Sequence, residues 1–178
     1  MIIGIAGKKW SGKDTVGKYL CEKYDYRRYA FGDPVKEVCR ILFGFNDEQL
    51  YGVKKEEMTE LGIRPREAFQ GVGTEFGRKL VHKLFPNLDI KEGELWIDIF
   101  RRQNLNKIVV TDVRFQNEAD AIKEKDGKII MLQSIYAKQD MHESEKIDVK
   151  YDYLIENVGT KEELYLQIDN LLTNLESV

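Results

Sequence analysis

This sequence of 178 residues has no long hydrophobic run, few cysteines and no excess of basic charge. No apolar segment is long enough to cross a bilayer, because a membrane-spanning helix needs about 20 consecutive apolar residues. Lys and Arg number 28 against 31 Asp and Glu, which gives a formal net charge of −3. This balance favours neither a nucleic-acid coat nor an anionic membrane surface. We therefore predict no nucleic-acid partner and no membrane partner.

Cysteine is present only at Cys21 and Cys39, without metal-ligand spacing between them. Two reduced thiols are the default interpretation for such a pair. Internal repeats and low-complexity stretches are also lacking, and a glycine-rich turn follows the first residues too soon for a signal peptide. We therefore expect a cytoplasmic protein.

What the sequence does contain is a glycine-rich stretch at Gly7–Thr15, with the letters GKKWSGKDT. An apolar run at 1–6 precedes it, and an amphipathic run with Val16 and Leu20 follows. The order of strand, glycine-rich loop and helix, with the spacing G-x-x-x-x-G-K, predicts a P-loop.

The chemistry of this loop is the binding of phosphate. Gly7 and Gly12 let the backbone bend so that consecutive N–H groups converge on an anion. The helix N-terminus adds its partial positive charge, and Lys13 can reach the terminal phosphates as a point charge. The predicted ATP-binding residues in this loop are Gly7, Lys8, Ser11, Gly12, Lys13, Asp14 and Thr15.

One position departs from the common motif. The residue after the lysine, normally Ser or Thr, is Asp14, and the hydroxyl comes one place later at Thr15. Hard cations take oxygen ligands, so Asp14 and Thr15 are the candidate Mg²⁺ ligands. The alternative for Asp14 is an acid in the first turn of a helix, favoured by the macrodipole.

Alternating apolar runs and amphipathic patterns predict an α/β fold, a three-layer P-loop NTPase sandwich with a five-stranded parallel sheet and a small lid segment. Small single-domain P-loop proteins with a polar, lid-like segment before the last strand are mostly small-molecule kinases. We therefore treat 1–178 as one P-loop kinase domain, with a helical acceptor region at 45–106 and a lid-like segment at 134–150. Strands are predicted at 1–6, 28–31, 107–112, 128–133 and 153–155. Helices are predicted at 13–24, 34–43, 65–84, 93–104, from about 118 to 127, and at 160–175, with one short helix in the polar segment 45–64.

Charged residues near the ends of predicted strands are candidates for roles in phosphoryl transfer. Asp112 ends a buried strand as the acid of a Walker-B-like strand would, and Arg114 follows where a γ-phosphate would lie. Arg78, Arg101 and Arg102 are weaker candidates, because arginines on helix surfaces are usually solvated. An acceptor phosphate needs no general base, whereas an alcohol would need one, from Asp14 or Asp33.

Two segments of the sequence contain the residues that we expect to bind the phosphate acceptor. Asp33 is expected to cap a helix that has Pro34 in its first turn and carries Lys36, just beyond a strand end. In the helix 65–84, three glycines suggest a face that a ligand or another backbone approaches closely. The polar residues on or beside that face are Gln70, Thr74, Glu75 and Arg78. Trp96 is a core residue more often than a ligand stacker.

Six segments in order resemble one family. They are Gly7–Thr15, Phe31–Glu37, Gln70–Arg78, Trp96, Val110–Glu118 and His142–Glu145. Together they resemble the deoxynucleoside monophosphate kinases of bacteriophages and large DNA viruses, over nearly the whole chain.

The resemblance implies transfer of the ATP γ-phosphate to a deoxynucleoside monophosphate (dNMP), with Mg²⁺, in deoxynucleotide supply. The predicted catalytic residues are Lys13, Asp14 and Arg114, and by this likeness Arg114 is a phosphate-clamping arginine. A viral source would place the protein in the host cytoplasm. The implied dNMP-binding residues are Asp33, Lys36, Gln70, Thr74, Arg78 and Trp96, to which we add Asp112; His142, Ser144 and Glu145 would lie by the lid and the ATP. An arginine expected before the lid is missing, and Lys138, Arg101 or Arg102 would have to replace it.

Two other classes stay open at this point. A P-loop sensor would bind nucleotide without phosphoryl transfer, and another kinase would act on a different small phosphorylated or alcohol acceptor, such as phosphomevalonate or dephospho-coenzyme A. The accepted bases and the oligomeric state also stay open, with a homodimer as one candidate.

Overall fold

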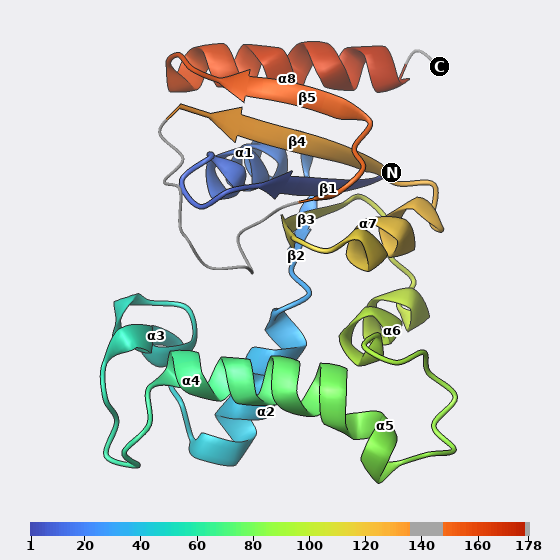
Figure 1. Ribbon diagram of the computed structural model, residues 1–178. Helices are drawn as coiled ribbons and strands as arrows, with labels where there is room; N and C mark the ends of the chain where they lie inside the picture. The colour runs from blue at the N-terminus through green and yellow to red at the C-terminus, as the bar shows by residue number, and fades with distance from the viewer. Residues whose placement is uncertain (136–147, 177–178) are drawn as a thin grey trace. The chain divides into compact units, whose positions relative to one another are not determined.

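The computed structural model describes residues 1–135 and 148–176. The chain divides into two compact units, which Figure 1 shows as a sheet with helices and a group of helices. The first unit combines Met1–Ala30 with Asn104–Val178, and the second is Phe31–Gln103. Within the described residues, no helix is long and apolar enough to cross a membrane.

The first unit is built on five parallel strands in the order β2-β3-β1-β4-β5. They are β1 (Ile2–Gly7), β2 (Arg27–Tyr29), β3 (Ile108–Val113), β4 (Lys128–Ser134) and β5 (Tyr153–Asn157). This confirms the predicted five-stranded parallel sheet, with small differences at strand ends. Because β1 is the central strand, its carboxyl end lies between those of β3 and β4, where open α/β sheets bind ligands.

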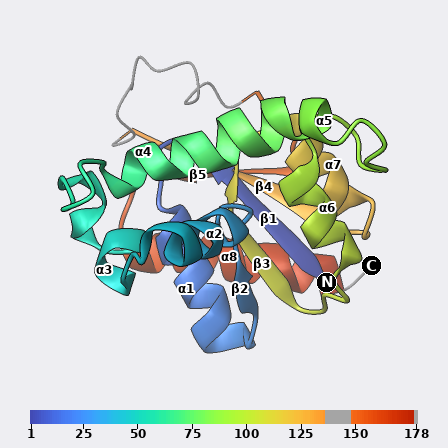
Figure 2. The same cartoon turned by 90° about the horizontal axis from the view of Figure 1, so that it is seen from below.

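Helices cover both faces of this sheet, which confirms the three-layer arrangement (Figures 1 and 2). On one face, Ile3 and Ile5 of β1 pack with apolar residues of α1 (Lys13–Tyr24) and α8 (Lys161–Glu176). On the other face, a side chain at Gly4 would meet Ile122 of α7 (Gln116–Lys123). β1 is therefore buried on both sides, which explains why its sequence is apolar without alternation.

The second unit is helical. Its elements are α2 (Asp33–Phe43), α3 (Asp47–Leu50), the 3₁₀ helix η1 (Val53–Glu56), α4 (Pro65–Gln70), the π-helix η2 (Gly71–Leu80), α5 (Val81–Leu84) and α6 (Leu95–Arg102). Its separate core is formed by Val35, Cys39, Phe45, Leu50, Ala68 and Trp96. Burial raises the pKa of the Cys39 thiol to about 11, so this cysteine is a neutral core residue. Both cysteines are free, as expected.

Two local predictions in this unit were wrong. Asp33 does not occupy the cap position of α2: the cap is Gly32, and Asp33 is the first residue of the helix. The segment 71–80 is π-helical rather than α-helical. Glycines lower the free-energy penalty for leaving α geometry, because they have no Cβ to crowd the turn. Such helices are rare and frequently mark functional sites.

A network centred on Asp169 joins α8 to α1. The Tyr19 and Tyr24 hydroxyls each donate to its Oδ1 at 2.7 Å, and the Lys23 ammonium donates to its Oδ2 at 2.7 Å. The Tyr19 ring also stacks on Tyr165, with 3.7 Å between centroids. Burial alone would raise the pKa of Asp169, but the three hydrogen bonds outweigh it and hold the pKa below 3.8.

We expect Asp169→Asn to lower the free energy of unfolding by about 1–3 kcal/mol at neutral pH, because the amide keeps the shape but loses the charge. Since the carboxyl pKa is lower in the folded state, its contribution is fully present above the unfolded pKa and is lost as pH falls through the folded pKa. The difference between the two proteins should therefore shrink below pH 3.8. Urea unfolding across this range measures it, and a difference independent of pH would contradict the assignment.

Candidate active site

The loop between β1 and α1 has the geometry of a phosphate cradle. Gly12 caps α1 with φ 102°, in the left-handed region that favours glycine. A Cβ on Gly7 would lie 2.6 Å from the carbonyl oxygen of Leu132 on β4, so the loop leaves β1 with no room for a side chain. The N–H groups of the first turn of α1 lack partners within the helix and provide donors for an anion.

Lys13 reaches back over this loop. Its Nζ donates to the carbonyl oxygens of Gly7 at 2.6 Å and Lys8 at 2.7 Å. The ammonium therefore lies at the mouth of the backbone turn, as a P-loop lysine must. The neighbouring Ser11 is fully buried, and its hydroxyl has no hydrogen-bond partner among the described residues.

Trp10 is a residue whose role the sequence did not reveal. It adopts φ 69°, a left-handed conformation that is strained for a bulky side chain. Its ring is 65% exposed, so packing does not explain the strain. In the sequence, only the glycine-rich stretch around position 10 indicated an unusual backbone conformation there.

The two candidate metal ligands lie in the first turn of α1, where Asp14 is exposed and Thr15 is half-buried. A carboxylate and a hydroxyl are the oxygen donors that Mg²⁺ takes. Among the described residues, no cluster of three or more His, Cys, Asp or Glu side chains could hold a metal by itself. This donor set fits a Mg²⁺ that keeps water and nucleotide oxygens as its other ligands.

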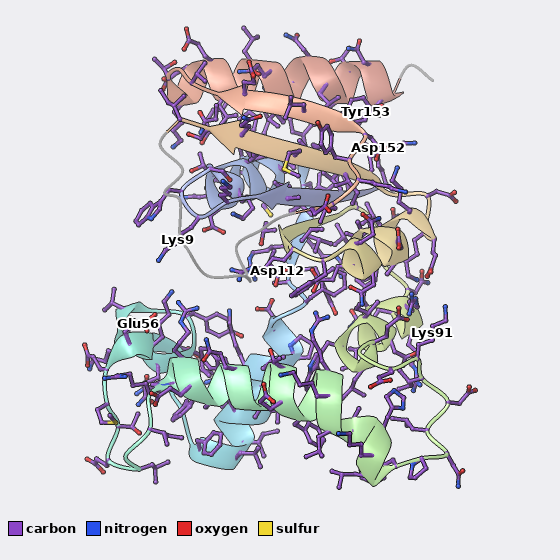
Figure 3. The ribbon with its side chains drawn as sticks, in the orientation of Figure 1. Lys9, Glu56, Lys91, Asp112, Asp152 and Tyr153 are labelled. Carbon is purple, nitrogen blue, oxygen red and sulfur yellow. The ribbon has the colours of Figure 1, made fainter. Side chains whose placement is uncertain are left out.

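The end of β3 lies beside the end of β1, since Ala6 pairs with Val113. Asp112, one residue before the end of β3, is half-buried, and Arg114 beyond it is exposed. Figure 3 shows Asp112 on this strand and Lys9 on the loop after β1. Strand pairing therefore brings the acid and the arginine to the same sheet edge as the phosphate loop.

Glu118 fixes the backbone around Arg114. It is 3% exposed, and its Oε2 accepts from the backbone N–H groups of Arg114 at 2.8 Å and Phe115 at 3.2 Å. The Arg114 guanidinium has no hydrogen bond or ion pair within 1–135 and 148–176. The carboxylate therefore orders the turn and leaves the guanidinium available for a ligand.

In the second unit, Lys36 is held by two neighbours. Its Nζ lies 3.6 Å from Asp33 Oδ1 and 4.3 Å from the centroid of the Tyr51 ring. The Tyr51 hydroxyl donates to Glu37 at 3.1 Å. Burial and this bond raise the pKa of Tyr51. Tyr51 was missed in the sequence, where an aromatic residue in the polar segment 45–64 was the available signal.

The polar residues of α4 and η2 line one side of the helix at intervals of four. Gln70 and Thr74 are exposed, and Arg78 is half-buried. On the buried side, the Trp96 indole donates to the Gly73 carbonyl at 2.8 Å. A Cβ on Gly77 would lie 2.3 Å from Trp96 Nε1. Two of the three glycines therefore serve the packing of the helix against Trp96 and Val35, while Gly71 has nothing within 4 Å.

Part of the predicted site lies outside the described residues: His142, Ser144, Glu145, Lys138 and most of the lid-like segment 134–150. The arginines suggested as replacements for the missing lid arginine are paired within the second unit. Arg101 contacts Glu94 at 2.5 Å, and Arg102 contacts Asp98 at 2.6 Å.

A parallel sheet with a P-loop after its central strand and an acid near the end of the neighbouring strand defines a P-loop nucleotide-binding protein. The model for the family described as deoxynucleotide monophosphate kinase matches residues 1–80. A protein of Acanthamoeba polyphaga mimivirus, named as a deoxynucleotide monophosphate kinase, is 35% identical over 188 residues, covering 98% of this chain and 97% of that protein. The chain therefore belongs to the deoxynucleotide monophosphate kinase family, which confirms the resemblance.

A second, more distant relative agrees with this class. The deoxynucleoside-5'-monophosphate kinase of Escherichia phage T5 is 26% identical over 191 residues, covering 70% of this chain and 72% of that protein. Among solved structures, a shikimate kinase from Aquifex aeolicus is 17% identical over 99% of this chain and 97% of its own, with a TM-score of 0.49. At that TM-score, the structural likeness supports no conclusion about this chain.

The contact between Gly77 and Trp96 gives a matched pair of variants in one helix. Gly77→Ala should lower the free energy of unfolding by about 1–3 kcal/mol, because the new Cβ displaces the indole. Gly71→Ala should be neutral or stabilising, because the site is open and alanine favours helix. Thermal melts and tryptophan fluorescence measure both. Equal effects at the two positions would show that the indole contact is unimportant.

Proposed function

We propose that this protein transfers the γ-phosphate of ATP to the phosphate of a deoxynucleoside monophosphate, giving ADP and a deoxynucleoside diphosphate. The observation that carries the proposal is a complete phosphate loop, with Lys13 at its mouth, in a chain of this kinase family. The proposed substrates are small molecules, ATP and a dNMP, and the proposed site of action is the cytoplasm, that of the host for a viral source.

The triphosphate of ATP would lie against the backbone N–H groups of the loop and the first turn of α1. The Lys13 ammonium would exchange the carbonyl oxygens of Gly7 and Lys8 for phosphate oxygens, which carry more negative charge. These groups are fixed before the reaction begins, so they stabilise developing charge without reorganisation.

Asp14 and Thr15 would hold Mg²⁺ beside the loop through their carboxylate and hydroxyl oxygens. When bound, the ion neutralises charge on the β- and γ-phosphates. The exposed Asp14 carboxylate has no hydrogen bond or ion pair in the described part of the chain, so its oxygens are available for this role.

The acceptor would be bound by the second unit. Lys36 and Arg78 supply positive charge for the dNMP phosphate, and Gln70 and Thr74 supply hydrogen-bonding groups for the nucleoside. The contact of Lys36 with the Tyr51 ring and Asp33 limits its rotamers, so less entropy is lost when it binds an anion. The acceptor phosphate is already ionised, so the reaction needs alignment and charge neutralisation rather than a general base.

Release of ADP in a coupled assay, with each common dNMP and NMP as acceptor, tests the proposal. We expect turnover with at least one dNMP. ATP binding without turnover on any acceptor would indicate a nucleotide sensor. Turnover only with dephospho-coenzyme A, phosphomevalonate or an alcohol would indicate a different kinase.

Lys13→Ala tests the phosphate loop. We expect turnover to fall by about 10²–10³-fold, because the transferring phosphoryl group loses a preorganised charge. The fold should persist, since the two bonds described above join Lys13 to the backbone of its own loop and not to the core. Lys18→Ala, at an exposed position on the same helix, is the control and should keep normal turnover. Circular dichroism and steady-state kinetics measure the effect, and near-normal turnover in Lys13→Ala would contradict the role.

We propose that Arg114 stabilises the negative charge that develops on the transferring phosphoryl group. Arg114→Ala should therefore lower kcat by about 10²-fold or more, with a smaller effect on KM. Arg114→Lys should recover only part of the activity, because lysine keeps the charge but loses the planar pair of donors. The melting temperature should not change, since the side chain is exposed.

Arg27→Ala is the matched control, because Arg27 is an exposed arginine at the amino end of β2 and therefore at the opposite edge of the sheet. A rise in KM for the dNMP alone would assign Arg114 to acceptor binding. Unchanged kinetics would remove it from the site.

A further inference from the structure

Asn157, the last residue of β5, contacts the phosphate loop from the other side of β4. Its side-chain Nδ2 donates to the backbone carbonyl of Ser11 at 3.0 Å. Residues 11 and 157 are distant in sequence, and Asn157 pairs in register with Ser134 of β4. The first unit thus carries an amide that holds a loop carbonyl from outside the loop.

This bond determines the direction of a donor. The peptide group between Ser11 and Gly12 is planar and trans, so its C=O and N–H point in opposite directions. When the Asn157 amide holds the Ser11 carbonyl, the Gly12 N–H is turned away from Asn157. Gly12 is the cap of α1, and its N–H is therefore one of the donors at the helix N-terminus that are available to an anion.

The contact is close enough to restrict the residue at position 12. A Cβ on Gly12 would lie 2.8 Å from Asn157 Nδ2, so any side chain there would displace the amide. Gly12 is thus required by this contact as well as by its backbone conformation.

The backbone beyond Asn157 is held by the start of α8. The Thr160 N–H donates to Glu163 Oε2 at 2.7 Å, and the Glu163 N–H donates to Thr160 Oγ1 at 3.2 Å, which together form a capping box. The Gln167 amide also donates to the carbonyl of Glu156 at 3.2 Å. The turn that follows Asn157 is therefore fixed by this capping box, whereas the Gln167 bond lies on the strand and does not reach the phosphate loop.

We propose that Asn157 is a positioning residue for the phosphates of the nucleotide, acting through the Ser11–Gly12 peptide without touching the ligand. The inference rests on the proposed use of this loop for ATP. The peptide has the same orientation before and during phosphoryl transfer, so its N–H binds the substrate and the transition state equally well. Loss of this binding alters KM for ATP and leaves kcat unchanged.

Two variants test it. Asn157→Ala removes the donor, and Asn157→Asp keeps the shape but replaces the donor by an acceptor facing the Ser11 carbonyl. In each we expect KM for ATP and the dissociation constant of Mg·ADP, from calorimetry, to rise about tenfold, the size of one lost hydrogen bond. We expect kcat and KM for the dNMP to stay within about twofold.

Gln167→Ala is the matched control, because it removes an amide-to-carbonyl bond at the same strand end that does not reach the loop. It should leave Mg·ADP binding unchanged, and melting temperatures identify any loss of fold. Normal Mg·ADP binding by both Asn157 variants would overturn the inference while leaving the proposed function intact. A wild-type protein that binds no Mg·ADP would overturn the proposed function itself, and the inference with it.

Discussion

The first unit depends on one constraint: a buried parallel strand must turn into a helix while presenting backbone N–H groups to an anion. This requires glycine at positions 7 and 12, where a Cβ would meet Leu132 or Asn157. It also requires a carboxylate, Glu118, to order the neighbouring turn that carries Arg114. Strand order then brings both turns to one sheet edge. The backbone of the two turns therefore supplies N–H donors at this sheet edge, and Lys13 lies at the opening of the loop.

In the second unit, one helix carries exposed polar side chains along one side and is packed against the unit's core on the other. The indole of Trp96 lies against Gly77 and takes the Gly73 carbonyl as its acceptor. This leaves Gln70 and Thr74 exposed on the helix. A π-helix widens the turn in the same ten residues. We attribute the wide turn to the glycines and the indole together. The glycines have no Cβ to crowd the turn, and the Trp96 indole packs in the place that their side chains would occupy.

The sequence predicted the sheet well, because buried parallel strands and their helices leave strong apolar patterns, as in β1 and β3. It predicted the phosphate loop for a similar reason, since glycine spacing reflects backbone geometry directly. It failed at Asp33, where helix capping and a first-turn acid have the same residue signature. It also failed at 71–80, because apolar residues four apart, such as Val72, Phe76 and Leu80, fit an α-helix as well as the wider turn of a π-helix. Tyr51 and Asn157 were missed because their partners, Lys36 and Ser11, are identified only by tertiary contacts. The residues of the acceptor pocket stay a prediction.

The most direct test of this account is a crystal structure of the protein with Mg·ADP. The account predicts the β-phosphate inside the loop 7–13, with Lys13 Nζ on a phosphate oxygen in place of the carbonyls of Gly7 and Lys8. It also predicts the Gly12 N–H directed at the phosphate, with the Asn157 bond to Ser11 retained. A nucleotide bound away from this loop, or a Lys13 that keeps its carbonyl partners while the loop holds ADP, would contradict it.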